Sequence, residues 1–203
     1  QQRLQFVDAD TKAVTVVARS KDWEFTDYSW SPDSKWIAFA RPEEKRMTTI
    51  QLYSVEKGTT HEVTDGWLSS GEPGFSADGK YLFFVSARPF NPTYGQTEFN
   101  HVYLDMSQIY LVTLAADTPS PFAPKSDEVK IKEEKKEPAK KEEADKKKKD
   151  SAVVVKVDPD GIGTRIAVLP VKAANYRNLQ SVGDKLFYVR AGRRDERPVL
   201  LVY

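Results

Sequence analysis

The sequence predicts an all-β fold: a partial β-propeller of about three four-stranded antiparallel blades, forming an arc of a six- or seven-bladed ring. The main observation is a repeat, because residues 28–41 return as residues 74–88. Asp33 is thereby matched by Asp78, 45 positions later, and this spacing is about the length of one blade. A weaker third copy covers residues 178–189. Aromatic residues at 11 %, with 12 Pro and 10 Gly, also suit a turn-rich β protein.

Each copy has the pattern of a tight hairpin, in which an aspartate lies between a short strand and an aromatic-rich strand. An Asp side chain in such a turn can accept hydrogen bonds from the backbone amides ahead of it. Glycine at the turn supplies a positive φ, and Ser34 takes its place in the first copy. Recurrence at a turn argues for a structural role rather than for acid–base chemistry. The residues assigned to these structural turns are Asp33, Lys35, Asp78, Gly79 and Lys80.

After each turn the apolar residues run almost without interruption, over residues 36–39 in the first copy and 81–85 in the second. Such a run predicts an inner strand that is covered on both faces, as in stacked blades. We therefore expect the aromatic residues of the repeats to form the core between blades. These residues are Trp30, Trp36, Phe75, Tyr81 and Phe83.

The first part of the chain predicts one strand pair followed by a complete unit. The pair is the outer part of a blade that begins upstream. A turn closes the first unit and ends in Trp67, an aromatic residue that can pack between neighbouring blades. The predicted strands cover residues 4–7 and 14–18 in the pair, and 27–31, 36–41, 49–55 and 60–64 in the first unit.

The second unit has strands at 72–76, 80–87 and 108–114, but a long connection, residues 88–103, separates the last two. It shows no strand alternation. Long connections in compact domains are more often functional or packed on a neighbour.

Beyond residue 124 the chain enters a Lys/Glu-rich run that cannot bury enough apolar surface to offset its ordering entropy. We expect it to be disordered or partly helical. Strands should return at 153–157 and 165–171, before the third unit, which the end of the sequence truncates. The predicted organisation is propeller blades over 1–124, the charged insertion over 125–152, and the remaining propeller strands over 153–203. Because the sequence lacks an initial Met and stops within a strand, we interpret it as a piece of a longer protein.

Composition excludes several classes of function. Outside residues 125–150 the chain carries 20 basic and 21 acidic residues, so no basic surface for nucleic acid is indicated. No stretch approaches the roughly 18 consecutive apolar residues of a membrane span. The absence of cysteine rules out disulfides and thiolate metal sites. No cofactor site is indicated.

Candidate catalytic and metal-binding residues are few. Ser69 and Ser70 lie among turn residues without a Gly-x-Ser-x-Gly motif, and we assign them no nucleophilic role. His61 and His101 lack ligand-spaced partners. The sequence Asp-Pro-Asp-Gly at 158–161 lacks the further oxygen ligands of an EF-hand and predicts a turn. We therefore predict no catalytic residue and no metal site in this segment.

The long connection is the main candidate for contact with a peptide or with another domain. It mixes aromatic rings with amide side chains, a combination suited to peptide backbone and apolar side chains. Packing against a neighbouring blade or domain is the alternative. The candidate contact residues are Tyr94, Phe99, Asn100, His101 and Tyr103. A basic group could hold a carboxylate, or could be a solvated loop, and it consists of Arg190, Arg193, Arg194 and Arg197.

The two main hairpins resemble those of TolB-type and prolyl-oligopeptidase-type propellers. A more particular series resembles the propeller region of bacterial tricorn protease homologues, over about residues 28 to 190. The series comprises Arg-Pro-Phe-Asn-Pro-Thr-Tyr at 88–94, Ile-Tyr-Leu-Val-Thr-Leu at 109–114, Pro-Ser-Pro-Phe-Ala-Pro at 119–124, the Lys/Glu insertion, Asp-Gly-Ile at 160–162, Arg-Ile-Ala-Val-Leu-Pro-Val at 165–171 and Ala-Asn-Tyr-Arg-Asn-Leu at 174–179.

This resemblance implies a large serine peptidase in which two propellers precede a mixed domain, a PDZ domain and the catalytic domain. In that family the propellers filter and guide peptides, and the catalytic residues lie far downstream, so none is carried over to this chain. The implied partners are peptide substrates and the downstream PDZ and peptidase domains of the same chain, and self-association is left open. The implied compartment is the cytoplasm, with the periplasm as the alternative. Two other functions remain open: a TolB-like protein-binding propeller and the gating propeller of a prolyl-oligopeptidase-like hydrolase.

Overall fold

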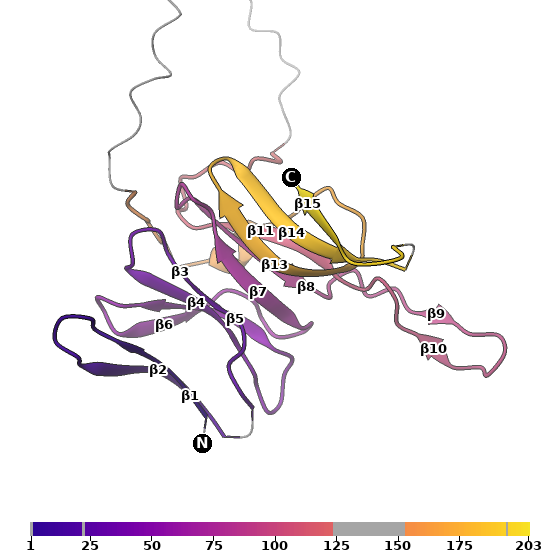
Figure 1. Cartoon of the computed structure of the whole chain (residues 1–203), viewed down its shortest axis with the longest axis horizontal. Coiled ribbons are helices and arrows are strands. Elements are labelled where there is room, and N and C mark those ends of the chain that lie inside the picture. The colour runs from indigo at the N-terminus through magenta and orange to yellow at the C-terminus, as the bar shows by residue number, and fades with distance from the viewer. Residues whose placement is uncertain (1, 22, 124–152, 194) are drawn as a thin grey trace, which may run out of the picture.

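The structure is a computed structural model that describes residues 2–21, 23–123, 153–193 and 195–203. Its elements are 15 β-strands and one 3-10 helix, and the described part contains no α-helix. No helix in that part is long and apolar enough to cross a membrane. The strands form four antiparallel sheets that follow one another side by side, together with one separate hairpin (Figure 1). This is the predicted propeller arc.

We call the first sheet the leading pair and the others blades 1 to 3. The leading pair is β1 (Gln2–Val7) and β2 (Val14–Ser20), and blade 1 is β3 (Tyr28–Trp30), β4 (Trp36–Arg41), β5 (Thr49–Ser54) and β6 (Thr59–Glu62). Blade 2 is β7 (Ser70–Phe75), β8 (Tyr81–Ser86), β11 (Gln108–Thr113) and β12 (Ile166–Val168). Blade 3 is β13 (Asn175–Val182), β14 (Lys185–Ala191) and β15 (Val199–Val202). The hairpin is β9 (Thr93–Tyr94) and β10 (His101–Val102), and the 3-10 helix η1 is Ile162–Arg165.

Apolar residues of neighbouring blades meet in three layers, because alternate side chains of each inner strand face opposite sides. In β8, Phe84 faces blade 1 and lies in a cluster with Leu52 and Ile50. Phe83, the next residue, faces blade 3 and packs beside Leu186. A third cluster joins the leading pair to blade 1. Strands β4 and β8 are thus covered on both faces, as their unbroken apolar runs predicted.

Most of the predicted core aromatics lie in these layers. Phe75 is buried, and Trp36, Tyr81 and Phe83 are partly buried against the clusters. Trp30 is half exposed, although its ring meets Phe6 of the leading pair edge-on at 5.6 Å between centroids.

The prediction for Trp67 was wrong. Its side chain is 83 % exposed and packs between no blades. The turn before it explains the difference, because the Trp67 amide donates to the Asp65 carboxylate at 3.2 Å and Gly66 has a φ of +72°. This turn directs the indole into solvent.

Residues 153–157 were predicted to be a strand, and the structure shows extended chain that joins no sheet. Val155 is nevertheless buried in the layer between blades 1 and 2. Its amide donates to the Asp33 carboxylate at 2.9 Å instead of to a neighbouring strand. The apolar pattern thus correctly predicted burial, but the Val155 amide bonds to the Asp33 side chain and not to the backbone of a neighbouring strand. The strand predicted at 165–171 is shorter and follows η1.

The innermost strands are linked by carboxylates that sit at equivalent positions of the repeat. Asp27 accepts a hydrogen bond from the Glu72 amide at 3.0 Å, and Glu72 accepts one from the Asn178 amide at 2.9 Å. Glu72 and Asn178 both have left-handed backbones and interrupt the register of their strands. Gly71 is required beside this contact, since a Cβ atom there would lie 2.8 Å from the Asp27 carboxylate. Each blade thus holds the next one by its inner edge.

Candidate functional site

The most distinctive feature outside the blades is the connection between β8 and β11. We call residues 89–104 the arm. The arm folds back on itself as the β9–β10 hairpin, in which His101 pairs with Tyr94 and the Gly95 amide donates to the Asn100 carbonyl at 2.7 Å. Figure 1 shows the arm projecting away from the blades. The expectation that this connection lacks strands was wrong, since the ladder is only two residue pairs long and leaves no detectable alternation in the sequence.

Aromatic rings form a continuous row along the arm. Ring centroids lie 6.1 Å apart between Phe90 and Tyr103, and 6.3 Å apart between Tyr103 and His101. The row continues from His101 to Tyr94 at 5.6 Å and from Tyr94 to Phe99 at 6.3 Å. These spacings are typical of weakly stabilising aromatic pairs. The rings remain largely in solvent, and Phe99 is 70 % exposed.

The structure therefore brings all five predicted contact residues onto one projecting hairpin. Four of them supply rings to the row, and the backbone carbonyl of the fifth, Asn100, accepts the hydrogen bond that closes the turn. Among the described residues, no side chain of the arm belongs to the three clusters between blades. In the described part of the chain the arm therefore does not pack into a layer between blades, and the alternative of packing against another domain stays a prediction. Phe90 was missed as a member of the row, although its place before Asn91 in the same aromatic-rich segment was a usable signal.

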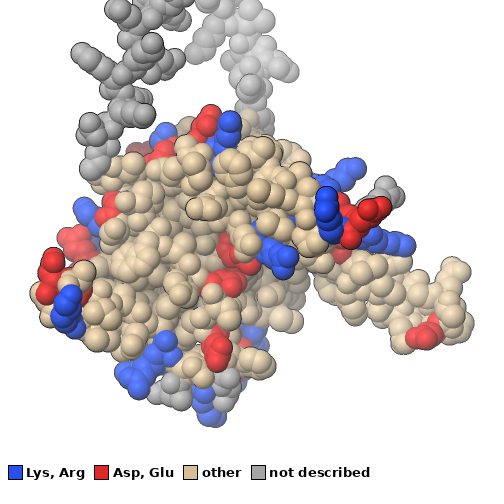
Figure 2. Space-filling model, in the orientation of Figure 1, with Lys and Arg blue, Asp and Glu red and all other residues tan. Residues whose placement is uncertain are grey.

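Charge is scarce on the arm. Glu98 is the one charged residue between positions 89 and 104, whereas 30 % of the whole chain is charged. Figure 2 shows the arm as an extension with no charged atoms except an acidic group near its end. An exposed, uncharged surface rich in Tyr and Phe has the composition of a protein interface.

The base of the arm is fixed to the body. The Arg88 guanidinium lies 5.7 Å from the centre of the Tyr110 ring, and burial raises the pKa of the Tyr110 hydroxyl. On the other side, the Arg193 amide of blade 3 donates to the Asp105 carboxylate at 3.0 Å. The direction in which the arm leaves the body is therefore set by contacts with blades 2 and 3.

The predicted basic group is only partly available to a ligand. Arg190 donates to both carboxylate oxygens of Asp195, at 3.0 and 2.8 Å, and this hydrogen bonding raises the pKa of Arg190. Asp195 also accepts from the Gly192 amide at 2.7 Å. Arg193 lines a hollow of about 490 Å³ with Lys172 and this ion pair. Arg197 is exposed, and Arg194 lies outside the described residues.

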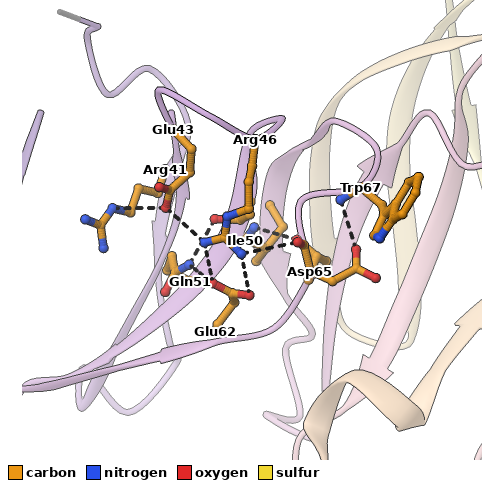
Figure 3. Close-up of polar contacts among 10 residues, drawn as sticks. Arg41, Glu43, Arg46, Ile50, Gln51, Glu62, Asp65 and Trp67 are labelled. Carbon is orange, nitrogen blue, oxygen red and sulfur yellow. Dashed lines mark hydrogen bonds and ion pairs between the residues drawn. The ribbon is translucent and has the colours of Figure 1, made fainter.

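The equivalent connection of blade 1, from β4 to β5, is short and is fixed by ion pairs. Arg46 donates to both carboxylate oxygens of Glu62, at 3.1 and 3.0 Å, and to the Asp65 carbonyl at 3.2 Å (Figure 3). Glu43 lies 3.5 Å from the same guanidinium. The connection from β4 to β5 is thus tied to the outer strand of its own blade, whereas the arm of blade 2 extends outward.

The recurring turns have the same geometry in blades 1 and 2. Asp33 accepts from the Ser31 hydroxyl at 2.6 Å and from the Lys35 amide at 3.2 Å. Asp78 accepts at 2.7 and 3.1 Å from the equivalent groups, the hydroxyl of Ser76 and the amide of Lys80. Ser34 and Gly79 both have positive φ, at 58° and 71°.

The residues considered for catalysis lie in structural settings. Ser70 is buried, and its hydroxyl donates to the Ser86 hydroxyl at 3.1 Å. The His61 ring lies 3.1 Å from the Thr59 hydroxyl and packs near Trp36. Within the described residues, no three His, Cys, Asp or Glu side chains are grouped so that they could hold a metal ion.

A groove of about 700 Å³ lies between blades 2 and 3, at the end of β8 that is opposite the arm. Successive connections of an antiparallel sheet alternate between its ends, so the β7–β8 turn and the arm lie at opposite ends of blade 2. The groove is lined mainly by apolar and aromatic side chains, among them Tyr81, Phe83, Phe122, Leu186 and Tyr203. Its size and lining suit an apolar ligand.

Comparison with known proteins agrees with this architecture. The family model described as "Tricorn protease second beta propeller domain" matches residues 1–197. The tricorn protease homolog 1 of Streptomyces coelicolor is 33 % identical over 188 residues, which is 93 % of this chain and 17 % of the relative. The chain thus spans about a sixth of that relative's length.

Solved structures show the same fold. The crystal structure of the tricorn protease matches 99 % of this chain and 19 % of its own length, with a TM-score of 0.74 and 20 % identity. TolB from Acinetobacter baumannii matches 99 % of this chain and 34 % of its own length, with a TM-score of 0.54 and 19 % identity. The family match over nearly the whole chain is the decisive finding. This chain belongs to the family of tricorn protease second β-propeller domains.

Proposed function

We propose that this chain is a non-catalytic propeller segment of a tricorn-like serine peptidase and guides or filters peptides on their way to a downstream proteolytic domain. The observation that carries the proposal is the match of residues 1–197 to the second propeller domain of tricorn protease. A TolB-like binding propeller shares the fold, but this family match favours the peptidase.

The groove between blades 2 and 3 is the surface best suited to a peptide. It lies between two blades, and its apolar lining offers contacts to side chains of varied shape. The arm is better suited to another protein surface, because it is exposed, nearly free of charge and rich in aromatic rings. We therefore assign the peptide to the groove and an interdomain or intersubunit contact to the arm.

The proposed partners are peptide substrates and the PDZ and peptidase domains of the same protein, and the proposed compartment is the cytoplasm. Cell fractionation with an antibody against the chain tests the compartment, and recovery with periplasmic markers would overturn that assignment.

Fluorescence anisotropy with labelled, uncharged peptides of about ten residues tests the peptide site. We expect saturable binding that weakens at least fivefold in Phe122→Ser and in Tyr203→Ser, since both rings line the groove. Trp67→Ser removes a larger, exposed ring that does not line the groove, and this variant should bind like the wild type. Absence of binding at millimolar chain concentration, or equal binding by all variants, would refute the assignment of the groove.

A second assay tests the absence of catalysis. The purified chain should not cleave fluorogenic peptides. Cleavage that survives repurification and disappears when one serine is replaced would contradict a non-catalytic role.

A further inference from the structure

We propose that the arm pairs with the arm of a second copy of this chain, through antiparallel contact of their β10 strands across a two-fold axis. The product would be a four-stranded sheet in the order β9–β10–β10–β9. This inference rests on the part of the proposed function that assigns an interdomain or intersubunit contact to the arm, and it names the partner. It is independent of the peptide site, because the pairing requires no peptide and uses the end of blade 2 opposite the groove.

The arm has little internal support. Its ladder comprises two residue pairs, and within the described part of the chain its side chains join no cluster between blades. An isolated two-stranded hairpin is only marginally stable in water, whereas sheets of three or more strands are stable. A second hairpin would supply the missing strands.

The two edges of the hairpin differ. Pro89 and Pro92 precede β9, and proline blunts a strand edge because it has no amide hydrogen. Residues 99–104, around β10, contain no proline. Asn100 directs its carbonyl at β9, so the backbone groups of the next residue, His101, turn to the open side. β10 therefore offers an unobstructed edge with His101 at its centre.

The low charge of the arm favours a second copy as its partner. A two-fold contact brings each group near its own counterpart, so any charge at the centre would repel itself. The arm carries one charged residue, Glu98, and it lies in the turn between the strands rather than on β10. Rings from both copies could then pack across the axis, as aromatic residues do at the centres of interfaces.

The contact would be small. An interface with a nanomolar dissociation constant commonly buries well over 1,000 Å², more than two such hairpins can cover. We expect a dimer with a dissociation constant in the range of about ten to several hundred micromolar.

Sedimentation equilibrium of the 203-residue chain, from about 1 to 500 µM, tests the proposal. The wild type should show a monomer–dimer equilibrium. His101→Pro removes an amide from the open edge of β10, and Tyr94→Ser removes the central ring of the row. Each should raise the dissociation constant at least tenfold without changing the melting temperature by more than about 2 °C, since the arm lies outside the core. Trp67→Ser, which removes another exposed ring, should leave the equilibrium unchanged.

Disulfide trapping provides a second readout, because the chain has no cysteine of its own. His101→Cys should oxidise to a covalent dimer, since the two Cα atoms would lie about 5.5 Å apart across the axis, within disulfide range. Trp67→Cys should remain monomeric under the same conditions. A chain that stays monomeric at every concentration would overturn the proposal. So would a dimer that persists in His101→Pro and is not trapped at position 101, because it would form through another surface.

Discussion

Replacement of Phe84 by alanine tests the inference that neighbouring blades stabilise each other. The Phe84 side chain is fully buried between blades 1 and 2, and its ring stacks on Tyr110 at 5.8 Å between centroids. Removal of a buried Phe commonly costs about 3–5 kcal/mol, from lost transfer free energy and from the cavity that remains. For a chain of this size, 1 kcal/mol shifts the melting temperature by about 2–4 °C, so we expect Phe84→Ala to melt about 6–20 °C lower.

The matched control is Trp67→Ala, which removes a larger ring from an exposed position. Its free energy of unfolding should change by no more than about 0.5 kcal/mol. Differential scanning calorimetry of the three proteins at one concentration measures both effects. Mutual stabilisation of the blades would be refuted by a Phe84→Ala variant that melts within about 2 °C of the wild type, or by a Trp67→Ala variant that loses as much stability as Phe84→Ala.

Three further predictions concern backbone conformation and pH. In urea unfolding, Gly66→Ala should destabilise the chain by more than Gly183→Ala. Both positions have positive φ, but a Cβ atom at Gly66 would lie 2.9 Å from Thr49, whereas a Cβ atom at Gly183 would have no neighbour within 4 Å. Equal losses of stability in the two variants would contradict this prediction. Burial alone would raise the pKa of Asp33, but hydrogen bonds from Ser31, Val155 and Lys35 outweigh it and leave the pKa lowered. Its contribution to stability is therefore present above the unfolded pKa of about 3.8 and is lost as pH falls through the folded value. Asp33→Asn should be less stable than the wild type at pH 7, with a gap that narrows toward pH 2, and a pH-independent gap would count against this carboxylate. Glu72 behaves in the opposite way, because burial raises its pKa and the charge of Asp27 adds to this effect. The contribution of Glu72 to stability is therefore lost as pH rises from about 4.5 through the pKa of Glu72 in the folded protein. Glu72→Gln keeps an oxygen acceptor and should gain stability relative to the wild type between pH 4 and pH 7, and thermal melts that remain parallel across this range would refute it.

The repeat and its turns were predictable because their determinants are local. An aspartate at the turn, a residue with positive φ after it and an apolar run define β4 and β8 in the sequence, and both strands begin within one residue of the expected position. Strand length and type follow from side chains a few positions apart, and these are visible without a structure.

The less accurate predictions depended on long-range contacts. Val155 has the side chain of a strand residue, but its amide bonds to Asp33, 122 positions away, and no local pattern reveals such a partner. The two-pair ladder of the arm is too short to produce a periodic pattern, and the carboxylate links from Asp27 and Glu72 depend on the alignment of separate blades. Sequence spacing did identify the aromatic residues of the arm, but not that their rings form one row.

The late arrival of β12 has a consequence for how the protein is made. The last strand of blade 2, β12, can pair with β11 only after residues 114–165 have been synthesised. Until then, one edge of β11 has no partner strand. Closing a connection of about 50 residues instead of a tight turn of about four costs roughly 2 kcal/mol in chain entropy, because this cost grows only with the logarithm of length. A ribosome-bound chain should therefore tolerate a reporter protein spliced into this connection, whereas one spliced between β4 and β5 would break the ion pairs of Arg46.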